Sequence, residues 1–366
     1  MGKIYTALGL MSGTSMDGVD ASIIQTDGKS KYKAILDKYF KYPESIYNDL
    51  TVLRDKVKIS KDLKKYQKKI ESIEENITVF HAESVEKILK KTRLNVDFIG
   101  FHGQTIFHNA DVKISKQLGD GKLLSKLTKK KVIYDFRQND LKNGGEGAPL
   151  TPIFHQMLQK KFNIKPVSFF NIGGILNSTT IRDDGGLSAT DLGPGMCLID
   201  KWIRTNTKKK YDKNGDIAKS GKINKIALDK YWDTLLASDS GRKSYDINDF
   251  SISTVKDLSL KDGASTLILY TANLFNNHFR ANEHLKKKEK IILCGGGRKN
   301  KFLVNIIKSY NKDVKLIDDY GIDGDFIESQ AFAYLAIRSY LGLPNSFPKT
   351  TGCKKPSTGG VIVKNY

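Results

Sequence analysis

A turn of small and polar residues near the start of the chain has the composition of a phosphate-binding loop. It reads Gly13-Thr14-Ser15-Met16-Asp17-Gly18. Its glycines allow backbone N–H groups to approach a polyphosphate, and its two hydroxyls add hydrogen-bond donors. The Asp17 carboxylate would repel phosphate unless a metal ion bridged the two, so the turn favours Mg²⁺. An ordinary hairpin turn has the same composition, and both interpretations stay open at this point.

Two later glycine clusters also follow predicted strands. Gly173-Gly174 occupies the equivalent place in a second β-rich segment, and Gly295-Gly296-Gly297 follows another short apolar run. None of these turns matches the Walker A loop or the dinucleotide-binding fingerprint. One glycine cluster is weak evidence for a ligand site. Three clusters at strand ends, two of them equivalent, indicate a bound nucleotide.

Asp191 is the candidate general base. It follows an alternating strand and precedes Leu192-Gly193-Pro194-Gly195. The Gly-Pro-Gly turn fixes the backbone and leaves room for a ligand beside the carboxylate, which would hold a hydroxyl or a water molecule in line with its target. The alternative is a helix N-cap for a segment that begins near Met196.

Cys197, Cys294 and His102 lie beside these motifs. Neither cysteine has an evident base partner, so we expect both to be small buried apolar residues. His102 has no second histidine at metal-ligand spacing, so we expect it to donate hydrogen bonds. The three cysteines of the chain show no CxxC spacing, which excludes a disulfide scaffold and a zinc cluster.

The elements that position these residues form two similar series. Strands are predicted over residues 3–10, 19–26, 32–42, 96–101 and 131–135, and again over 167–171, 175–181, 187–191 and 290–293. Between Ser60 and Lys91 apolar residues recur every three or four positions, which predicts a core-facing helix. A strongly apolar final helix is expected at about 328–341. Each series begins with strand, glycine-polar turn, strand, turn, strand, so the chain is predicted to contain two duplicated domains that face each other across a cleft.

Length and charge narrow the class of protein. A chain of 366 residues exceeds what one core usually organises, so two domains are expected. The net charge of +21 comes from scattered lysines without a nucleic-acid-binding signature, which favours a solvated surface whose field would attract an anionic small molecule. The sequence has neither an apolar run of membrane-spanning length nor a secretion signal, so a cytoplasmic protein is expected.

The run Gly9–Asp20 closely resembles the opening of the anhydro-N-acetylmuramic acid kinases, which belong to the actin, Hsp70 and sugar-kinase superfamily. Matching motifs continue in the same order over nearly the whole chain. They are His102–Thr105, Gln117–Asp120, Asp135–Arg137, Gly144–Leu150, Asn171–Ile175, Asp191 with Gly193–Gly195, Cys294–Gly297 and Glu328–Ala333.

The resemblance implies an α/β fold with two duplicated ribonuclease-H-like (actin-like ATPase) domains around a central cleft. The first would comprise residues 1–136 plus 338–366, and the second residues 137–337. The family uses ATP and water to open 1,6-anhydro-N-acetylmuramic acid and to phosphorylate O6, giving N-acetylmuramic acid 6-phosphate in peptidoglycan recycling. ATP and Mg²⁺ are therefore expected, together with a homodimer and with no nucleic-acid or membrane partner.

The resemblance also implies roles for individual residues. Asp191 would deprotonate the attacking water, and Arg137 would pair with the lactyl carboxylate of the sugar. The sugar side would be formed by His102, Gln104, Thr105, Arg137, Gly193 and Glu328. ATP would be held by Gly13, Thr14, Ser15, Met16, Asp17, Gly18, Val19 and Asp20, with Gly173, Gly174, Gly295, Gly296 and Gly297, and Asp17 would hold the metal ion.

The sequence departs from the family pattern beside the proposed base. Leu192 and Met196 stand where the family usually has threonine and asparagine, and Lys243 replaces an acidic residue. Two alternatives follow. The protein is a kinase for another sugar or acid, with Asp191 acting on a substrate hydroxyl, or it is a non-catalytic nucleotide-binding scaffold. The presence of Asp17, Asp191 and Glu328 argues against the scaffold.

Overall fold

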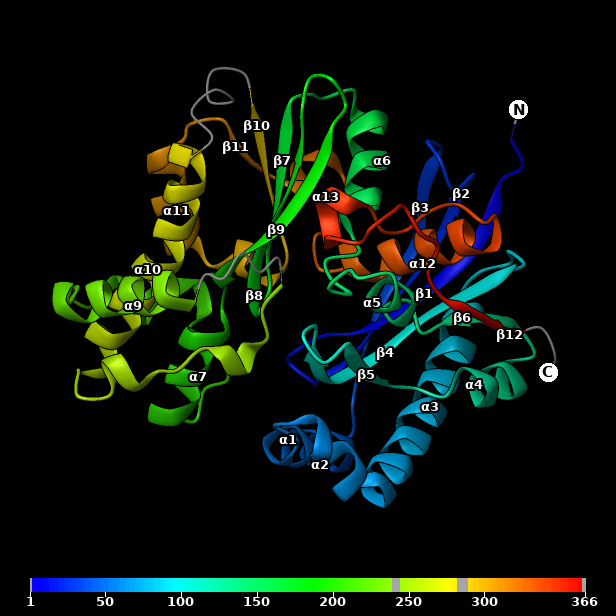
Figure 1. Cartoon of the computed structure of the whole chain (residues 1–366), viewed down its shortest axis with the longest axis horizontal. Helices are drawn as coiled ribbons and strands as arrows, with labels where there is room; N and C mark the ends of the chain where they lie inside the picture. Colours follow the sequence, from blue (N-terminus) through cyan, green and yellow to red (C-terminus); the bar gives the residue numbers. More distant parts are fainter. Residues whose placement is uncertain (1, 239–243, 282–288, 364–366) are drawn as a thin grey trace. The chain divides into compact units, whose positions relative to one another are not determined.

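The computed structural model describes residues 2–238, 244–281 and 289–363, which form two compact units (Figure 1). Unit 1 contains residues 1–163 and 325–366, and unit 2 contains residues 164–324. The predicted domain boundaries, after residues 136 and 337, differ from the observed ones, which follow residues 163 and 324. Helix α6 (Pro152–Phe162) packs on β3 (Tyr32–Lys41), and α12 (Ile327–Tyr340) packs on four strands of the same sheet, so both helices belong to unit 1.

Unit 1 is built on a seven-stranded sheet of order β12-β6-β4-β1-β2-β3, with β5 paired to β4. β1 (Tyr5–Ser12) lies antiparallel to β2 (Gly18–Thr26), and β2 lies antiparallel to β3. On its other side β1 runs parallel to β4 (Phe98–Asn109), and β4 runs parallel to β6 (Lys131–Tyr134). The remaining strands are β5 (Ile114–Leu118) and β12 (Val361–Val363).

Unit 2 repeats this topology in a five-stranded sheet of order β11-β10-β7-β8-β9. β7 (Val167–Ile172) is antiparallel to β8 (Ile175–Ile181), which is antiparallel to β9 (Leu187–Pro194). β7 is parallel to β10 (Lys290–Cys294), and β10 is parallel to β11 (Val314–Leu316). The first strand of each unit therefore separates two antiparallel strands from two parallel ones. The same arrangement in both units confirms the predicted duplication and the ribonuclease-H-like fold.

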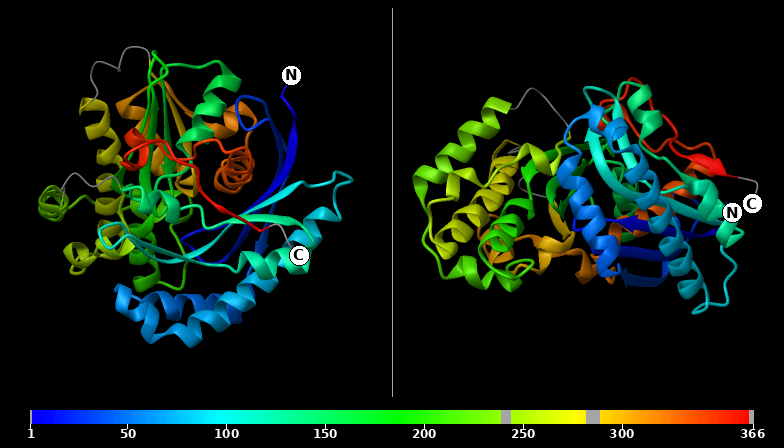
Figure 2. Two further views of the ribbon diagram at one scale, coloured as in Figure 1. Left: turned by 45° about the vertical axis from the view of Figure 1, so that its right-hand side comes forward. Right: turned by 90° about the horizontal axis from the view of Figure 1, so that it is seen from below.

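Helices cover both faces of the unit 1 sheet. Leu8 and Leu10 of β1 belong to the core beneath α3 (Gln67–Leu89). Because successive strand residues face opposite sides, Gly9 faces the other side and lies against α12. Figure 2 shows α3 and α12 on opposite sides of this sheet. A Cβ atom at Gly9 would lie 1.8 Å from the carbonyl oxygen of Ser329, so only glycine permits α12 this close. The predicted final helix is confirmed, one residue earlier than expected at each end.

The predicted helix over 60–91 forms as two pieces, α2 (Ser60–Lys65) and α3, which are separated at Tyr66. Other helices of unit 1 are α1 (Glu44–Lys56), α4 (Gly121–Thr128), α5 (Gln138–Lys142) and α13 (Pro348–Thr351). Unit 2 contains α7 (Cys197–Asn206), α8 (Asp216–Lys219), α9 (Lys225–Ser238), α10 (Leu260–Ala281) and α11 (Lys301–Tyr310). Across the described ranges, no helix combines the length and the apolar character required to cross a membrane.

Two strands extend further than the sequence predicts. β4 continues through the His102–Thr105 motif to Asn109, because β5 pairs with it and supplies partners for Gln104 and Thr105. β9 continues past Asp191 to Pro194, because β8 pairs with it across an irregular register. The segments His102–Thr105 and Leu192–Pro194 were expected to follow the strands, whereas both lie within them.

Candidate functional site

The turn between β1 and β2 is fixed from within. The Met16 N–H donates to the Gly13 carbonyl oxygen at 3.1 Å, which closes a tight turn. Met16 has a left-handed backbone with φ of 57°, and its side chain is buried in the unit 1 core. Thr14 and Ser15 are exposed. The chain therefore anchors the turn by a buried side chain and presents its two hydroxyls to solvent.

Asp17 is held at the end of this turn. Its carbonyl oxygen accepts hydrogen bonds from the Tyr42 N–H at 2.9 Å and from the Tyr39 hydroxyl at 2.8 Å. Its carboxylate accepts one from the Ser15 hydroxyl at 2.5 Å. Burial, with the charges of Asp17 and Asp20, raises the pKa of Tyr39, so this phenol remains a donor. Mg²⁺ in phosphoryl-transfer sites is usually held by one or two carboxylates together with phosphates and water. The half-buried Asp17 carboxylate fits that donor set.

Gly13 and Gly296 are glycines at positions where the fold would accept a side chain. Neither has a positive φ, and a Cβ atom built on either would meet no heavy atom of the described residues within 4 Å. The conformation of the chain therefore does not require glycine at these positions. The missing side chain leaves open space over the backbone, as the close approach of a phosphate or a nucleotide requires.

His102 of β4 and Arg137, which follows β6, form one polar group. The His102 Nδ1–H donates to the Gly103 carbonyl oxygen (2.9 Å), so Nε2 accepts from Nε and Nη2 of Arg137 at 3.1 and 3.0 Å. A third guanidinium N–H donates to the Gly147 carbonyl oxygen at 2.7 Å. Burial and the Arg137 charge hold the pKa of His102 well below its ordinary value. The imidazole is therefore neutral, and it orients the guanidinium.

Gln104 lies beside the turn at the end of β1. It is 1% exposed, and its Nε2 donates to the Gly13 carbonyl oxygen at 3.0 Å. Its Oε1 has no hydrogen-bond partner among the described residues. The neighbouring Thr105 hydroxyl accepts from Gln117 Nε2 at 3.1 Å. A buried amide oxygen without a partner is a position at which a ligand donor would be favourable.

Glu328 lies in the first turn of α12. Contacts at Gly9 and Gly28 show that α12 begins over the C-terminal half of β1 and runs back toward its start. Glu328 therefore lies near the end of β1 that leads into the turn. One end of the unit 1 sheet, where β1 ends, therefore brings together the turn, the His102–Arg137 pair, Gln104, Thr105 and Glu328.

Asp191 of unit 2 lies at a β-bulge. Asn177 pairs with Asp191 and Leu176 pairs with Gly193, so Leu192 is the extra residue. Bulges re-aim side chains beside active sites. The Tyr245 N–H donates to Asp191 Oδ2 at 2.8 Å, which fixes the carboxylate. Helix α7 begins at Cys197 after Met196, so the N-cap alternative for Asp191 is wrong.

The departures from the family pattern have a structural explanation at two positions. Leu192 and Met196 both pack against the hydrophobic core of unit 2. Lys243, the third departure, lies outside the described residues, as does the rest of 239–243. The two apolar replacements therefore stabilise the turn by packing.

The glycine turns of unit 2 meet at one end of its sheet. The Gly195 and Met196 N–H groups donate to the carbonyl oxygens of Gly174 (2.9 Å) and Gly173 (2.8 Å). Gly295–Gly297 follows β10, which pairs with β7, and a Cβ atom at Gly295 would lie 2.4 Å from Asn171 Oδ1. The two turns therefore share the carboxyl ends of adjacent parallel strands, where α/β sheets bind ligands.

Arg298 was not among the site residues predicted from the sequence. Its guanidinium, nearly fully buried, donates to both carboxylate oxygens of Asp318 at 2.6 and 2.9 Å, to Asp323 at 3.2 Å and to the Gly295 carbonyl oxygen at 3.0 Å. These bonds lower the pKa of Asp318 and fix the start of the glycine turn. The signal in the sequence is an arginine directly after three glycines.

The cysteine expectation is confirmed for Cys294, which is fully buried, and burial raises the pKa of its thiol. Burial also raises the pKa of Cys197 to about 12. Thiolates are disfavoured at both positions, so neither residue has the character of a nucleophile.

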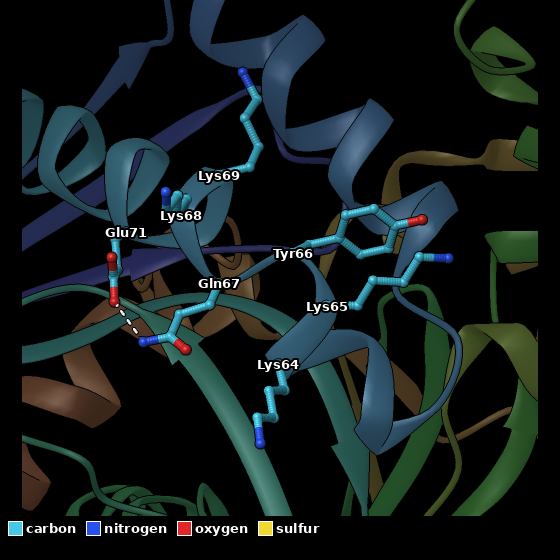
Figure 3. A pocket seen from close by; sticks show the side chains of 7 residues that line it. All are labelled: Lys64, Lys65, Tyr66, Gln67, Lys68, Lys69 and Glu71. Carbon is cyan, nitrogen blue, oxygen red and sulfur yellow. Dashed lines mark hydrogen bonds between the residues drawn. The ribbon is translucent and has the colours of Figure 1, made fainter.

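A hollow at the junction of α2 and α3 lies apart from these groups (Figure 3). Its seven lining residues are consecutive or nearly so along the chain, and most are exposed. Gln67 Nε2 donates to Glu71 Oε1 at 2.9 Å, and Lys69 pairs with Asp49 at 2.5 Å. None of the predicted site residues lines it.

Comparison with known proteins identifies the family. A family model described as anhydro-N-acetylmuramic acid kinase matches residues 5–365. Proteins of that name from Pelagibacter ubique (strain HTCC1062) and Agrobacterium fabrum (strain C58 / ATCC 33970) are 52% and 38% identical, each over the full length of both chains. Among solved structures, the activator of the 2-hydroxyisocaproyl-CoA dehydratase from Clostridium difficile with bound ADPNP has a TM-score of 0.44 and 10% identity, covering 91% of this chain and 94% of that one. The chain belongs to the anhydro-N-acetylmuramic acid kinase family of ATP-using phosphotransferases.

Proposed function

We propose that the protein transfers the γ-phosphoryl group of ATP to O6 of 1,6-anhydro-N-acetylmuramic acid while water opens the anhydro ring. The water oxygen bonds to the anomeric carbon, the bond from that carbon to O6 breaks, and O6 takes the phosphoryl group. ADP leaves, and the water proton passes to Asp191 and then to solvent. Full-length relatives of this name support the substrate.

The observation that carries the proposal is the fixed carboxylate of Asp191. A general base must hold its lone pair toward the water that it deprotonates. The bulge at Leu192 and the hydrogen bond from the Tyr245 N–H restrict the orientation of this side chain. Asp191 is therefore already ordered by its own unit for that task.

In this proposal the turn Gly13–Asp20 holds the ATP phosphates through its backbone and through the exposed Thr14 hydroxyl. Ser15, whose hydroxyl donates to Asp17, contributes through its backbone. Val19 and Met16 are buried in the core, so they contribute through their backbone. Gly173, Gly174 and Gly295–Gly297 hold the rest of the nucleotide. Asp17 would hold Mg²⁺, which neutralises phosphate charge when bound.

The sugar is assigned to the polar residues of unit 1 and to Gly193. Arg137 pairs with the lactyl carboxylate, and neutral His102 keeps the guanidinium in place without competing for that anion. Gln104 Oε1 accepts a hydroxyl of the sugar, which provides this buried atom with a partner. Thr105 and Glu328 bind further hydroxyls.

The test is mass spectrometry of the reaction in ¹⁸O-labelled water with the anhydro sugar, ATP and Mg²⁺. A phosphorylated sugar with one heavy oxygen at the anomeric carbon is expected. Asp191→Asn should lower kcat by about 10²–10⁴-fold and leave ATP binding largely intact. The exposed Asp183→Asn is the matched control. Near-normal turnover of Asp191→Asn would exclude Asp191 as the base.

The same experiment tests the second candidate, a kinase for another sugar or acid. The loss of two polar family residues beside Asp191 favours it, because Leu192 and Met196 pack against the unit 2 core and offer the ligand no hydrogen bond. Such an enzyme would leave the anhydro sugar unphosphorylated and would phosphorylate another acceptor without incorporating water oxygen. For the first candidate, we further propose a cytoplasmic homodimer that acts in peptidoglycan recycling.

A further inference from the structure

A buried chain of hydrogen bonds connects α3 to the residue that precedes the Gly13–Gly18 turn. Ser12 ends β1, and its Oγ lies 2.8 Å from the Tyr42 hydroxyl and 3.2 Å from His81 Nε2. His81 Nδ1 lies 2.8 Å from the carbonyl oxygen of Ile77. The three side chains are at most 2% exposed, so these contacts are shielded from water.

The contact of His81 with Ile77 determines which group donates in each of these hydrogen bonds. A carbonyl oxygen only accepts, so the proton of His81 is on Nδ1 and is donated to Ile77. Nε2 is therefore a hydrogen-bond acceptor, and the Ser12 hydroxyl donates to it. Ser12 Oγ in turn accepts from the Tyr42 hydroxyl. Burial lowers the pKa of His81 to about 4, which keeps the imidazole neutral near neutral pH.

Tyr42 links this chain to the other end of the turn. Its hydroxyl contacts Ser12, the residue before Gly13, and its backbone N–H donates to the carbonyl oxygen of Asp17 at 2.9 Å. One residue therefore ties together the two ends of the segment that is assigned to the ATP phosphates. Phe101 and Tyr42 pack around the His81 ring, with ring centroids at 4.9 and 6.3 Å.

We propose that His81 is a positioning residue of the nucleotide site, acting through Ser12 and Tyr42 to fix the Gly13–Gly18 turn in the conformation that receives the ATP phosphates. The proposal rests on the assignment of this turn under the proposed function. His81 lies on α3, far along the chain from the turn, and it does not contact the ligand itself in this scheme. His81 therefore affects nucleotide binding only by holding the turn in this conformation.

The experiment measures the affinity of the full-length enzyme for a non-hydrolysable ATP analogue with Mg²⁺ by calorimetry. His81→Phe keeps an aromatic ring and removes the acceptor, Ser12→Ala removes the hydroxyl, and His81→Gln restores an acceptor near Nε2. Ser84→Ala is the matched control, because its hydroxyl is buried on the same helix and bonds only to the Phe80 carbonyl oxygen of that helix in the described structure. The melting temperature is measured for each variant.

His81→Phe and Ser12→Ala should each weaken analogue binding by about 5–10-fold, the effect of one lost buried hydrogen bond. The double variant should bind no more than about twofold worse than either single variant, because both remove the same chain. His81→Gln and Ser84→Ala should stay within about twofold of the parent. A lower melting temperature with unchanged affinity in His81→Phe and Ser12→Ala would show a purely structural role and overturn the proposal.

Gly13→Ala separates this proposal from the one on which it rests. Weakened binding in Gly13→Ala with unchanged binding in His81→Phe overturns the role of His81 alone. Unchanged binding in Gly13→Ala removes the turn from the phosphate site and overturns both assignments. The binding assay needs no sugar, so a wrong sugar substrate leaves its outcome intact.

Discussion

Gly13→Ala is the most direct test of the Gly13–Gly18 turn as a phosphate site. The fold accepts a side chain at this position, whereas a phosphate on the backbone would not. The backbone of Gly13 is outside the left-handed region, and a Cβ atom there meets no described heavy atom within 4 Å. Its carbonyl bonds to Met16 and Gln104 are compatible with alanine. At such positions the change to alanine stabilises proteins by about 0.4–1 kcal/mol through the unfolded chain. The variant should therefore melt at or slightly above the temperature of the parent.

Nucleotide binding should respond in the opposite direction. A methyl group over this peptide keeps a phosphate from approaching the backbone and removes one charge-assisted hydrogen bond. That loss is about 1.5–3 kcal/mol, or roughly 10–100-fold in the Kd for ATP. Calorimetry with a non-hydrolysable analogue and Mg²⁺ measures it. Gly2→Ala, whose Cβ would meet only Asp27 at 3.9 Å, is the control. An unchanged Kd in a stable Gly13→Ala protein would refute the reasoning.

Three further changes test other parts of the structure. Gly9→Ala should prevent α12 from docking, since the new methyl would overlap the carbonyl oxygen of Ser329, and limited proteolysis should show the loss. Burial raises the pKa of Asp200 to about 7, so this group reduces stability progressively as pH rises from about 4 to about 7. Asp200→Asn should therefore raise the melting temperature at about pH 8 and leave it unchanged near pH 4. Arg298→Met should lower the melting temperature and weaken analogue binding, because the Gly295 carbonyl loses its side-chain donor and keeps only the backbone N–H of residue 298. Equal binding in Arg298→Met would restrict this arginine to stability.

The sequence was sufficient for elements that are bounded by turn residues or strongly apolar. The strand over 175–181, which lies between two glycine pairs, has the predicted bounds, and the strongly apolar final helix is displaced by one residue. The duplication also followed from sequence, since each unit begins with three strands separated by turns. The break at Tyr66 did not, because the apolar spacing continues through it.

The residues of the candidate site were proposed from the sequence, whereas their partners were not. The glycine turns and Asp191 were found by composition, whereas the continuation of β4 through His102 depends on pairing with β5, a non-local contact. The bulge at Leu192 likewise depends on the register of β8 against β9. The pairing of His102 with Arg137 joins residues 35 positions apart, and periodicity carries no information about such contacts.

The duplicated units use equivalent positions for different tasks. The turn after the first strand is Gly13–Gly18 in unit 1, with exposed hydroxyls and a carboxylate. Its counterpart Gly173-Gly174 in unit 2 has neither, and its carbonyl groups instead accept hydrogen bonds from Gly195 and Met196. The third strands of the two units, β3 and β9, also differ. In unit 1, Tyr39 and the following Tyr42 hold the turn, whereas in unit 2 the third strand bears Asp191 at a bulge. Under the proposed function, a symmetric fold thus acquires distinct phosphate-binding and base-bearing halves through a few side chains at matched strand ends.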